Sequence, residues 1–226
     1  MIHVSNVTKT YDDGTIKVNA LRGIDLEIRE GEFTAIVGPS GSGKTTLLNI
    51  VGGLDSATTG KIEIGSKDIS TLSENELIDF RLNHIGFVFQ SYNLIPVLTA
   101  KENVEFLMLL QKKSEEEREK RTTKLLQAVG LADQINKKPN EMSGGQQQRV
   151  AVARALASKP DFVLADEPTA NLDSKSTANL LDIMLELNKQ ENITFVFSTH
   201  DQRVIDRAKR IITVEDGQVL SDVTKG

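Results

Sequence analysis

The sequence predicts an α/β fold with a mainly parallel core sheet, an antiparallel β subdomain and a helical insertion. Short apolar runs of the buried-strand type alternate with stretches of helical periodicity, an order typical of parallel sheets. Two hairpin-like regions turn at residues 12–14 and 216–217, where Asp and Gly are concentrated. A long helical region separates two of the apolar runs, which indicates an insertion.

The N-terminal part of the chain is predicted to be mostly strand. Its partly alternating apolar and polar residues are typical of half-buried antiparallel strands. The expected elements are strands over residues 2–9 and 18–33, a hairpin over 60–69, a strand over 85–90 and a loop over 91–100.

The C-terminal part is predicted to alternate helices and strands. Ser114 and Glu117 form one capping-box pattern, and Ser143 and Gln146 form a second. We interpret the charged run 112–124 as a solvated helix face. The expected elements are helical structure over 101–131, a helix from 143 to about 159, a strand over 162–165, a helix over about 174–190, a strand over 194–197, a helix after Asp201 and a hairpin over 211–221.

No linker or internal repeat interrupts the chain. We therefore expect one domain over residues 1–226 with two lobes: a core of about 1–90 and 156–226, and a helical insertion of about 91–155.

Composition limits the classes of function. The chain has 226 residues, of which 38% are hydrophobic and 26% charged, as in ordinary globular proteins. The net charge of −5 argues against a nucleic-acid binder, and the absence of cysteine excludes disulfides and thiolate metal sites. We find no signal peptide and no apolar run near the roughly 20 residues that span a bilayer. A membrane would be reached through a partner.

Residues 34–46 carry the most specific motif. A predicted buried strand over 34–37 is followed by the phosphate-binding pattern G-x-x-x-x-G-K-[ST] and then by a predicted helix. Loop amides and the helix N-terminus would bind phosphate, Lys44 would reach the β- and γ-phosphates, and Thr45 would offer a hydroxyl to Mg²⁺. The alternative is a Gly/Ser surface turn. The expected nucleotide-contacting residues here are Gly38, Pro39, Ser40, Gly41, Ser42, Gly43, Lys44, Thr45 and Thr46.

Polar side chains also follow three other predicted strands. Asp166 and Glu167 end one apolar run, and Gln90 and His200 end two others. In an open α/β sheet such strand ends face the ligand crevice. Asp166 would help to hold Mg²⁺ and Glu167 would polarise the attacking water. Gln90 would reach the metal or water, and His200 would contact the γ-phosphate and lock Glu167. Alone, each could instead be structural.

A second glycine-containing helix start, Ser143-Gly144-Gly145-Gln146, can also bind an anion. An ordinary N-cap is the alternative interpretation. Two such helix ends far apart in one chain suggest a head-to-tail dimer, in which each site combines the phosphate loop of one copy with the Ser-Gly-Gly helix of the other.

Together these residues resemble the ATP-binding subunit of an ABC transporter over essentially the whole chain. The resemblance includes the phosphate loop, Gln90 as the Q-loop glutamine, Met142 to Gln146 as the family signature, the D-loop Ala170 to Asp173, and His200 as the switch histidine. Met142 replaces the usual leucine, a mild apolar change. From position alone Tyr11 is a half-buried strand aromatic, but the resemblance implies that it stacks on adenine. It also implies Asp173 among the nucleotide-contacting residues.

Residues 86–96, Asn103-Val104 and 165–173 resemble the lipoprotein-releasing and macrolide-export subgroup. The resemblance implies the ABC ATPase fold on a P-loop NTPase core, Mg²⁺-dependent ATP hydrolysis by a homodimer, and a cytoplasmic location on the inner face of the membrane. An integral membrane permease would bind near the loop from Ser91 to Pro96 and would use the hydrolysis for export, lipoprotein release or mechanotransmission. No direct contact with nucleic acid is expected.

Four other functions are compared with the sequence pattern. A regulatory GTPase would need N-K-x-D, but residues 136–139 read N-K-K-P. A chromosome or DNA-repair ATPase would need a long coiled-coil insertion. A ribosome-acting ABC protein usually carries two cassettes in one chain. An ATP-switch ABC protein of non-transport function stays open as the alternative.

Overall fold

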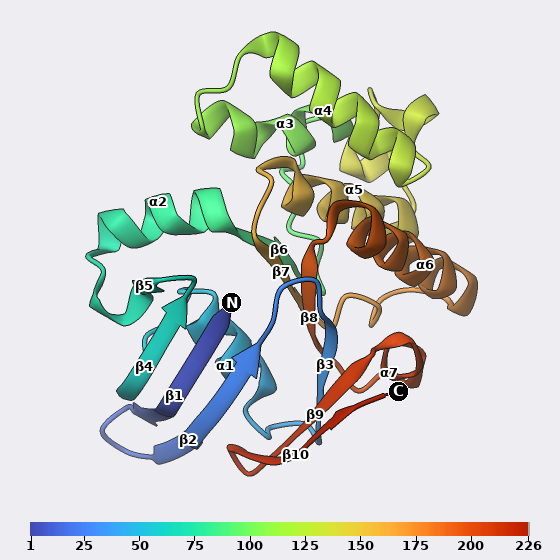
Figure 1. Ribbon diagram of the computed structural model, residues 1–226. Coiled ribbons are helices and arrows are strands. Elements are labelled where there is room, and N and C mark those ends of the chain that lie inside the picture. The colour runs from blue at the N-terminus through green and yellow to red at the C-terminus, as the bar shows by residue number, and fades with distance from the viewer. Residues whose placement is uncertain (226) are drawn as a thin grey trace.

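Two β-sheets and the helices packed around them build the fold, which the computed structural model describes for residues 1–225 (Figure 1). The first sheet is antiparallel and has the strand order β2-β1-β4-β5. Its members are β1 (Ile2–Asp12), β2 (Lys17–Ile28), β4 (Thr59–Ile64) and β5 (Lys67–Asp68). The predicted N-terminal strands and the hairpin after residue 60 are therefore confirmed.

The second sheet has the order β10-β9-β3-β8-β7-β6 and is parallel except at its β9–β10 edge. Asp166 of β7 is level with Ser198 of β8, and Ser198 is in turn level with Ile36 of β3. The carboxyl ends of three neighbouring strands thus share one edge. The members are β3 (Phe33–Val37), β6 (Ile85–Val88), β7 (Phe162–Asp166), β8 (Thr194–Ser198), β9 (Arg210–Glu215) and β10 (Gln218–Thr224).

Seven α-helices connect or cover the strands in the described part of the chain. Figure 1 shows α3 and α4 at the top of the molecule, above α5 and α6. The helices are α1 (Lys44–Val51), α2 (Glu74–His84), α3 (Ala100–Leu110), α4 (Glu115–Ala128), α5 (Gly144–Ala157), α6 (Ser174–Glu191) and α7 (Gln202–Arg207). None of the helices described is both long enough and apolar enough to cross a membrane.

The hydrophobic core lies on both faces of the parallel sheet. Successive residues of β7 face opposite sides because side chains alternate along a strand. Val163 and Ala165 pack with α3 to α6, whereas Phe162 and Leu164 pack with α1 and the antiparallel sheet. The parallel sheet is therefore buried on both faces, which explains its continuous apolar runs.

Four details differ from the sequence prediction. The helix α2 was not predicted, because Phe80 is its only buried residue and its apolar periodicity is weak. The expected helical region 101–131 is two helices, α3 and α4. The interpretation of 112–124 as a solvated face is wrong in part, since Thr122 is buried and Arg121 forms a largely buried ion pair. The expected lobe boundary at residue 155 falls inside α5.

Candidate active site

The loop between β3 and α1 turns at glycines that no other residue could replace easily. Gly38 and Gly43 have φ angles of +149° and +102°. A Cβ at Gly38 would overlap the carbonyl oxygen of Val214, and a Cβ at Gly43 would lie 2.6 Å from the carbonyl oxygen of Ala20. Close backbone approach from β2 and β9 therefore fixes the path of the loop.

Lys44 begins α1 and carries its ammonium back over this loop. The Nζ atom donates to the carbonyl oxygens of Gly38 at 2.8 Å and Pro39 at 2.9 Å, and the residue is only 7% exposed. Both acceptors are neutral, so an incoming phosphate would make a stronger, charge-assisted bond with the same ammonium. The helix N-terminus adds favourable dipole charge at this place.

Thr45 and Asp166 bring oxygen atoms together beside the loop. The Thr45 hydroxyl lies 3.0 Å from Oδ1 and 3.1 Å from Oδ2 of Asp166, the last residue of β7. Among the residues described, no group of three or more His, Cys, Asp or Glu side chains could hold a metal. Mg²⁺ typically takes one or two protein ligands and completes its shell with water and phosphate oxygens. A hydroxyl beside a carboxylate fits that requirement.

Glu167 is held from two sides. Its Oε1 lies 2.7 Å from Nδ1 of His200, and its Oε2 accepts a hydrogen bond of 3.2 Å from the Thr199 hydroxyl. The Glu167 side chain is 17% exposed and the His200 side chain 76% exposed. Glu167 has φ of +44°, a left-handed conformation that a non-glycine residue seldom adopts and that often marks functional sites. The carboxylate is thus sheltered and oriented, while the imidazole stays accessible.

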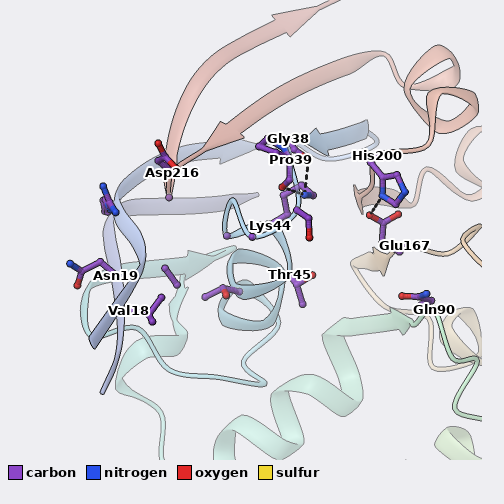
Figure 2. Close-up of a pocket in the computed structure, with 17 residues that line it drawn as sticks. Val18, Asn19, Gly38, Pro39, Lys44, Thr45, Gln90, Glu167, His200 and Asp216 are labelled. Carbon is purple, nitrogen blue, oxygen red and sulfur yellow. Dashed lines mark hydrogen bonds and ion pairs between the residues drawn. The ribbon is translucent and has the colours of Figure 1, made fainter. Parts of the chain in front are cut away.

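These groups surround one cavity of about 730 Å³, a size suited to a nucleotide. Figure 2 shows Lys44 and Thr45 on one side of the cavity and Glu167, His200 and Gln90 on the other. The phosphate loop, apart from Ser42, and three of the four predicted strand-end residues, Gln90, Glu167 and His200, therefore line one cavity, and the fourth, Asp166, contacts the Thr45 hydroxyl.

Part of the cavity wall was missed by sequence reasoning. It comes from β2 and from the β9–β10 turn: Val18, Asn19, Ala20, Arg22, Asp216 and Gly217. No local motif marks these positions. They meet the loop through long-range backbone bonds, from Arg22 N–H to the Gly217 oxygen at 2.8 Å and from Gly217 N–H to the Ser42 oxygen at 3.1 Å.

Several predicted site residues do not line this cavity, namely Tyr11, Ser42, Asp166, Asp173 and residues 143–146. Ser143 caps α5 and forms the predicted box with Gln146, with reciprocal bonds of 2.8 Å and 3.3 Å. Asp173 caps α6 by accepting from two backbone N–H groups. Tyr11 donates its hydroxyl to Asp55 at 2.7 Å and is not among the residues that line the cavity.

The backbone around Gln90 is tied to α5 and to the loop after β7. Tyr92 and Asn93 have φ angles of +57° and +50°, and the Arg154 guanidinium donates to both of their carbonyl oxygens, at 2.9 Å and 2.5 Å. The buried amide of Gln148 donates to the carbonyl oxygens of Phe89 and Pro168. The loop after Gln90 is therefore held in one conformation by side chains of α5.

Comparisons with known proteins agree with this geometry. The chain matches the family model described as ABC transporter over residues 21–170. It is 46% identical over 225 residues to the macrolide export ATP-binding/permease protein MacB of Brucella melitensis. The matched stretch covers 100% of this chain and 35% of that protein. It is 44% identical over 213 residues to the lipoprotein-releasing system ATP-binding protein LolD of Legionella pneumophila, covering 94% of each. In structure it is similar to the dimeric post-hydrolysis state of the ATP-binding cassette MJ0796 bound to ADP and Pi, with a TM-score of 0.91, 46% identity and coverage of 99% and 98%.

Proposed function

The chain belongs to the ABC transporter family as an ATP-hydrolysing subunit, and from this premise we propose that two copies close head to tail around two ATP molecules and transmit the motion to a membrane partner. The observation that carries the proposal is the pair Glu167–His200, 2.7 Å apart, on the side of the cavity opposite Lys44 and Thr45. A phosphate chain between the two sides would contact a cation, helix-terminal amides and an oriented carboxylate.

Binding of the phosphates would fall to the loop and to Lys44. The backbone amides of residues 38–45 and the N-terminus of α1 would surround the β-phosphate, and the Lys44 ammonium would exchange its two carbonyl bonds for phosphate oxygens. Tyr11 would stack on the adenine ring. Its exposed position on β1 supports this role, since 43% of the residue is accessible.

Thr45, Asp166 and Gln90 would hold Mg²⁺, with Asp166 acting through a bound water. The meeting of the Thr45 hydroxyl with the Asp166 carboxylate supports this ligand set. The bound metal would neutralise charge on the β- and γ-phosphates.

Hydrolysis would depend on Glu167. One oxygen accepts from His200 and the other from Thr199, so the carboxylate has a fixed orientation toward the cavity. It would orient the attacking water and accept its proton. His200, which is largely exposed, would bind the γ-phosphate and report its loss by changing its bond to Glu167.

The second copy would complete each site. The N-terminus of α5, from Ser143 to Gln146, carries two glycines, and Ser143 is exposed. It does not line the cavity of its own chain. In a head-to-tail dimer it would approach the γ-phosphate bound by the partner, with Asp173 at the same interface. The dimeric state of the similar cassette supports this arrangement.

The membrane partner would bind beside the loop at residues 91–96. An open groove of about 450 Å³ next to this loop is lined mainly by apolar side chains, which come from α2, β6, α3 and the loop itself and include the exposed Ile78. The chain would thus be peripheral on the cytoplasmic face of the membrane and would power export or lipoprotein release, as the names of the relatives MacB and LolD indicate for those proteins.

Size-exclusion chromatography of Glu167→Gln tests this function. Without ATP the variant should elute near the chain mass of 24.8 kDa, and with ATP it should shift to about twice that mass, because binding persists while hydrolysis stops. The matched control is Glu116→Gln, which changes an exposed residue of α4. This control still hydrolyses ATP, so it should be monomeric once its ATP has been consumed. A Glu167→Gln chain that stays monomeric at every ATP concentration would contradict the proposal.

A further inference from the structure

A second cavity, of about 790 Å³, lies between α4, the C-terminal end of α3 and the C-terminal end of α5. Five of its lining residues are cations, and one, Glu117, is an acid. Nothing in the proposed ATPase cycle uses this basic pocket. Three of its lysines, Lys113, Lys120 and Lys124, belong to the run 112–124 that was interpreted from sequence as a solvated helix face, and an ordinary solvated face is not hollow.

Only some of these cations are neutralised by the protein. Arg121 and Lys124 bind the carboxylate of Glu191 at 2.8 Å and 2.7 Å, and hydrogen bonds from Arg121 lower the pKa of Glu191 to about 2. The other three, Lys113, Lys120 and Lys159, make no ion pair with the residues described.

The pocket therefore keeps an excess of positive charge. The facing acid is Glu117, whose pKa is lowered chiefly by its bonds to the Ser114 cap and further by the nearby charges of Lys113 and Lys159. One carboxylate faces three lysines that have no other partner. An anionic ligand would complete the charge balance, and lysine binds phosphate well as a point charge.

Buried polar atoms in the pocket also lack partners. Ser158 is 6% exposed, yet its hydroxyl makes no hydrogen bond. Gln111 donates its amide nitrogen to three acceptors, which fixes its orientation, and its Oε1 is left buried with no donor. Such groups are rarely left unsatisfied in native proteins. Both atoms are closed off from solvent, so they lie beneath the surface that a ligand would contact, and the ligand is expected to bind the lysines.

We propose that this basic pocket binds the phosphate of an anionic phospholipid headgroup at the membrane surface. The inference rests on the proposed function, because it needs the groove beside residues 91–96 to face a membrane partner. The groove and the basic pocket are adjacent. Leu82 and Leu107 line the groove, and the residues that follow them in the chain, Asn83 and Met108, line the pocket. Leu109 and Leu110, 54% and 51% exposed, end α3 beside the lysines. Exposed leucines next to lysines suit a surface of acyl chains and anionic headgroups.

Vesicle co-sedimentation of the full chain tests the proposal. The probes are vesicles of phosphatidylglycerol and phosphatidylcholine in equal parts and vesicles of phosphatidylcholine alone. The variant K113E/K120E/K159E changes three exposed lysines of the pocket, and K137E/K189E/K209E changes three exposed lysines elsewhere with the same change in net charge. The parent and the control should bind the anionic vesicles, and the pocket variant should bind them roughly tenfold or more weakly.

Equal loss of binding in both triple variants, or no binding of the parent to anionic vesicles, would overturn the proposal. Binding of soluble glycerol 3-phosphate without vesicle binding would overturn the assignment to lipid.

The same samples separate this inference from the proposed function. ATP hydrolysis in lipid-free solution should be the same for both triple variants and the parent, because all six lysines lie outside the nucleotide cavity. If the pocket variant loses vesicle binding but keeps normal hydrolysis and normal ATP-driven dimerisation, the loss is due to the pocket alone. Failure of ATP-driven dimerisation in Glu167→Gln would contradict the proposed function instead.

Discussion

Oε1 of Glu167 lies 2.7 Å from Nδ1 of His200, so the residues that follow β7 and β8 form one hydrogen-bonded unit at the edge of the parallel sheet. A carboxylate can only accept, so Nδ1 of His200 carries the hydrogen of this bond. The pairing follows from topology: β7 and β8 are neighbours, with Asp166 level with Ser198.

Glu167→Gln should lower the rate of ATP hydrolysis by about a hundredfold or more while ATP binding persists, because the amide keeps the shape of the side chain but cannot accept a proton. Single-turnover hydrolysis and equilibrium nucleotide binding measure the two effects. The exposed Glu116→Gln serves as control and should match the parent. Hydrolysis at the parental rate in Glu167→Gln would remove this residue from the role of base.

Two glycines of the phosphate loop should respond differently to alanine. Gly41 and Gly43 both have positive φ, so each substitution costs about 1 kcal/mol of backbone strain. Only at Gly43 does the new Cβ collide with the backbone, 2.6 Å from the Ala20 oxygen, and at Gly41 nothing lies within 4 Å. Gly43→Ala should therefore lose about 1–3 kcal/mol more of unfolding free energy. Thermal unfolding compares the two, and equal losses would show that the close approach to β2 is unimportant.

Arg154→Lys should loosen the loop after Gln90. The arginine donates to the carbonyl oxygens of Tyr92 and Asn93, and a lysine cannot reproduce both bonds in the same geometry. We expect faster hydrogen exchange at residues 91–96, equivalent to about 1–3 kcal/mol of lost local stability. Arg149→Lys, which changes an arginine bound to the Asn179 side chain, is the matched control. Unchanged exchange in Arg154→Lys would exclude this role.

Asp201 should contribute stability that disappears in acid. Hydrogen bonds from Arg203, and also from Thr169, lower the pKa of Asp201 from its ordinary 3.8 to about 2. Because the folded pKa lies below the unfolded one, the contribution is fully present above about pH 4 and is lost as pH falls toward 2. Its size is about 2 kcal/mol at most.

Asp201→Asn should therefore be less stable than the parent at neutral pH, and the difference should shrink between pH 4 and pH 2. Denaturant unfolding at each pH measures it. Asp79→Asn, a change of an exposed aspartate on α2, corrects for the general effect of losing a carboxylate. A difference that stays constant over this range would contradict the assigned pKa shift.

Much of the fold and of the site followed from local sequence signals. The phosphate loop, the caps at Ser114, Ser143 and Asp173, and the strand ends at Asp166 and Gln90 each have a signature within a few residues. Helix α2 lacks apolar periodicity, but Ser73 and Glu76 form a capping box, which is a local sequence signal for its N-terminus.

What the sequence could not supply depends on pairing between distant segments. Ala20 and Gly217 line the cavity only because β2 and the β9–β10 turn come to the phosphate loop. No sequence signal assigned a role to Thr199, because its bond to Glu167 forms only when β7 and β8 are side by side. The basic pocket likewise combines the ends of α3 and α5 with the face of α4.

Mixing two inactive variants tests most directly whether each ATP site is shared between copies. Lys44→Ala removes the phosphate cation, and Ser143→Asp keeps a helix-capping residue but places a negative charge where the γ-phosphate would bind. Each variant alone should hydrolyse little ATP. In an equal mixture, half of the dimers would contain one intact site, so activity should recover to about a quarter of the parental rate. Parental activity in Ser143→Asp alone, or a mixture no more active than its separate components, would contradict the shared site.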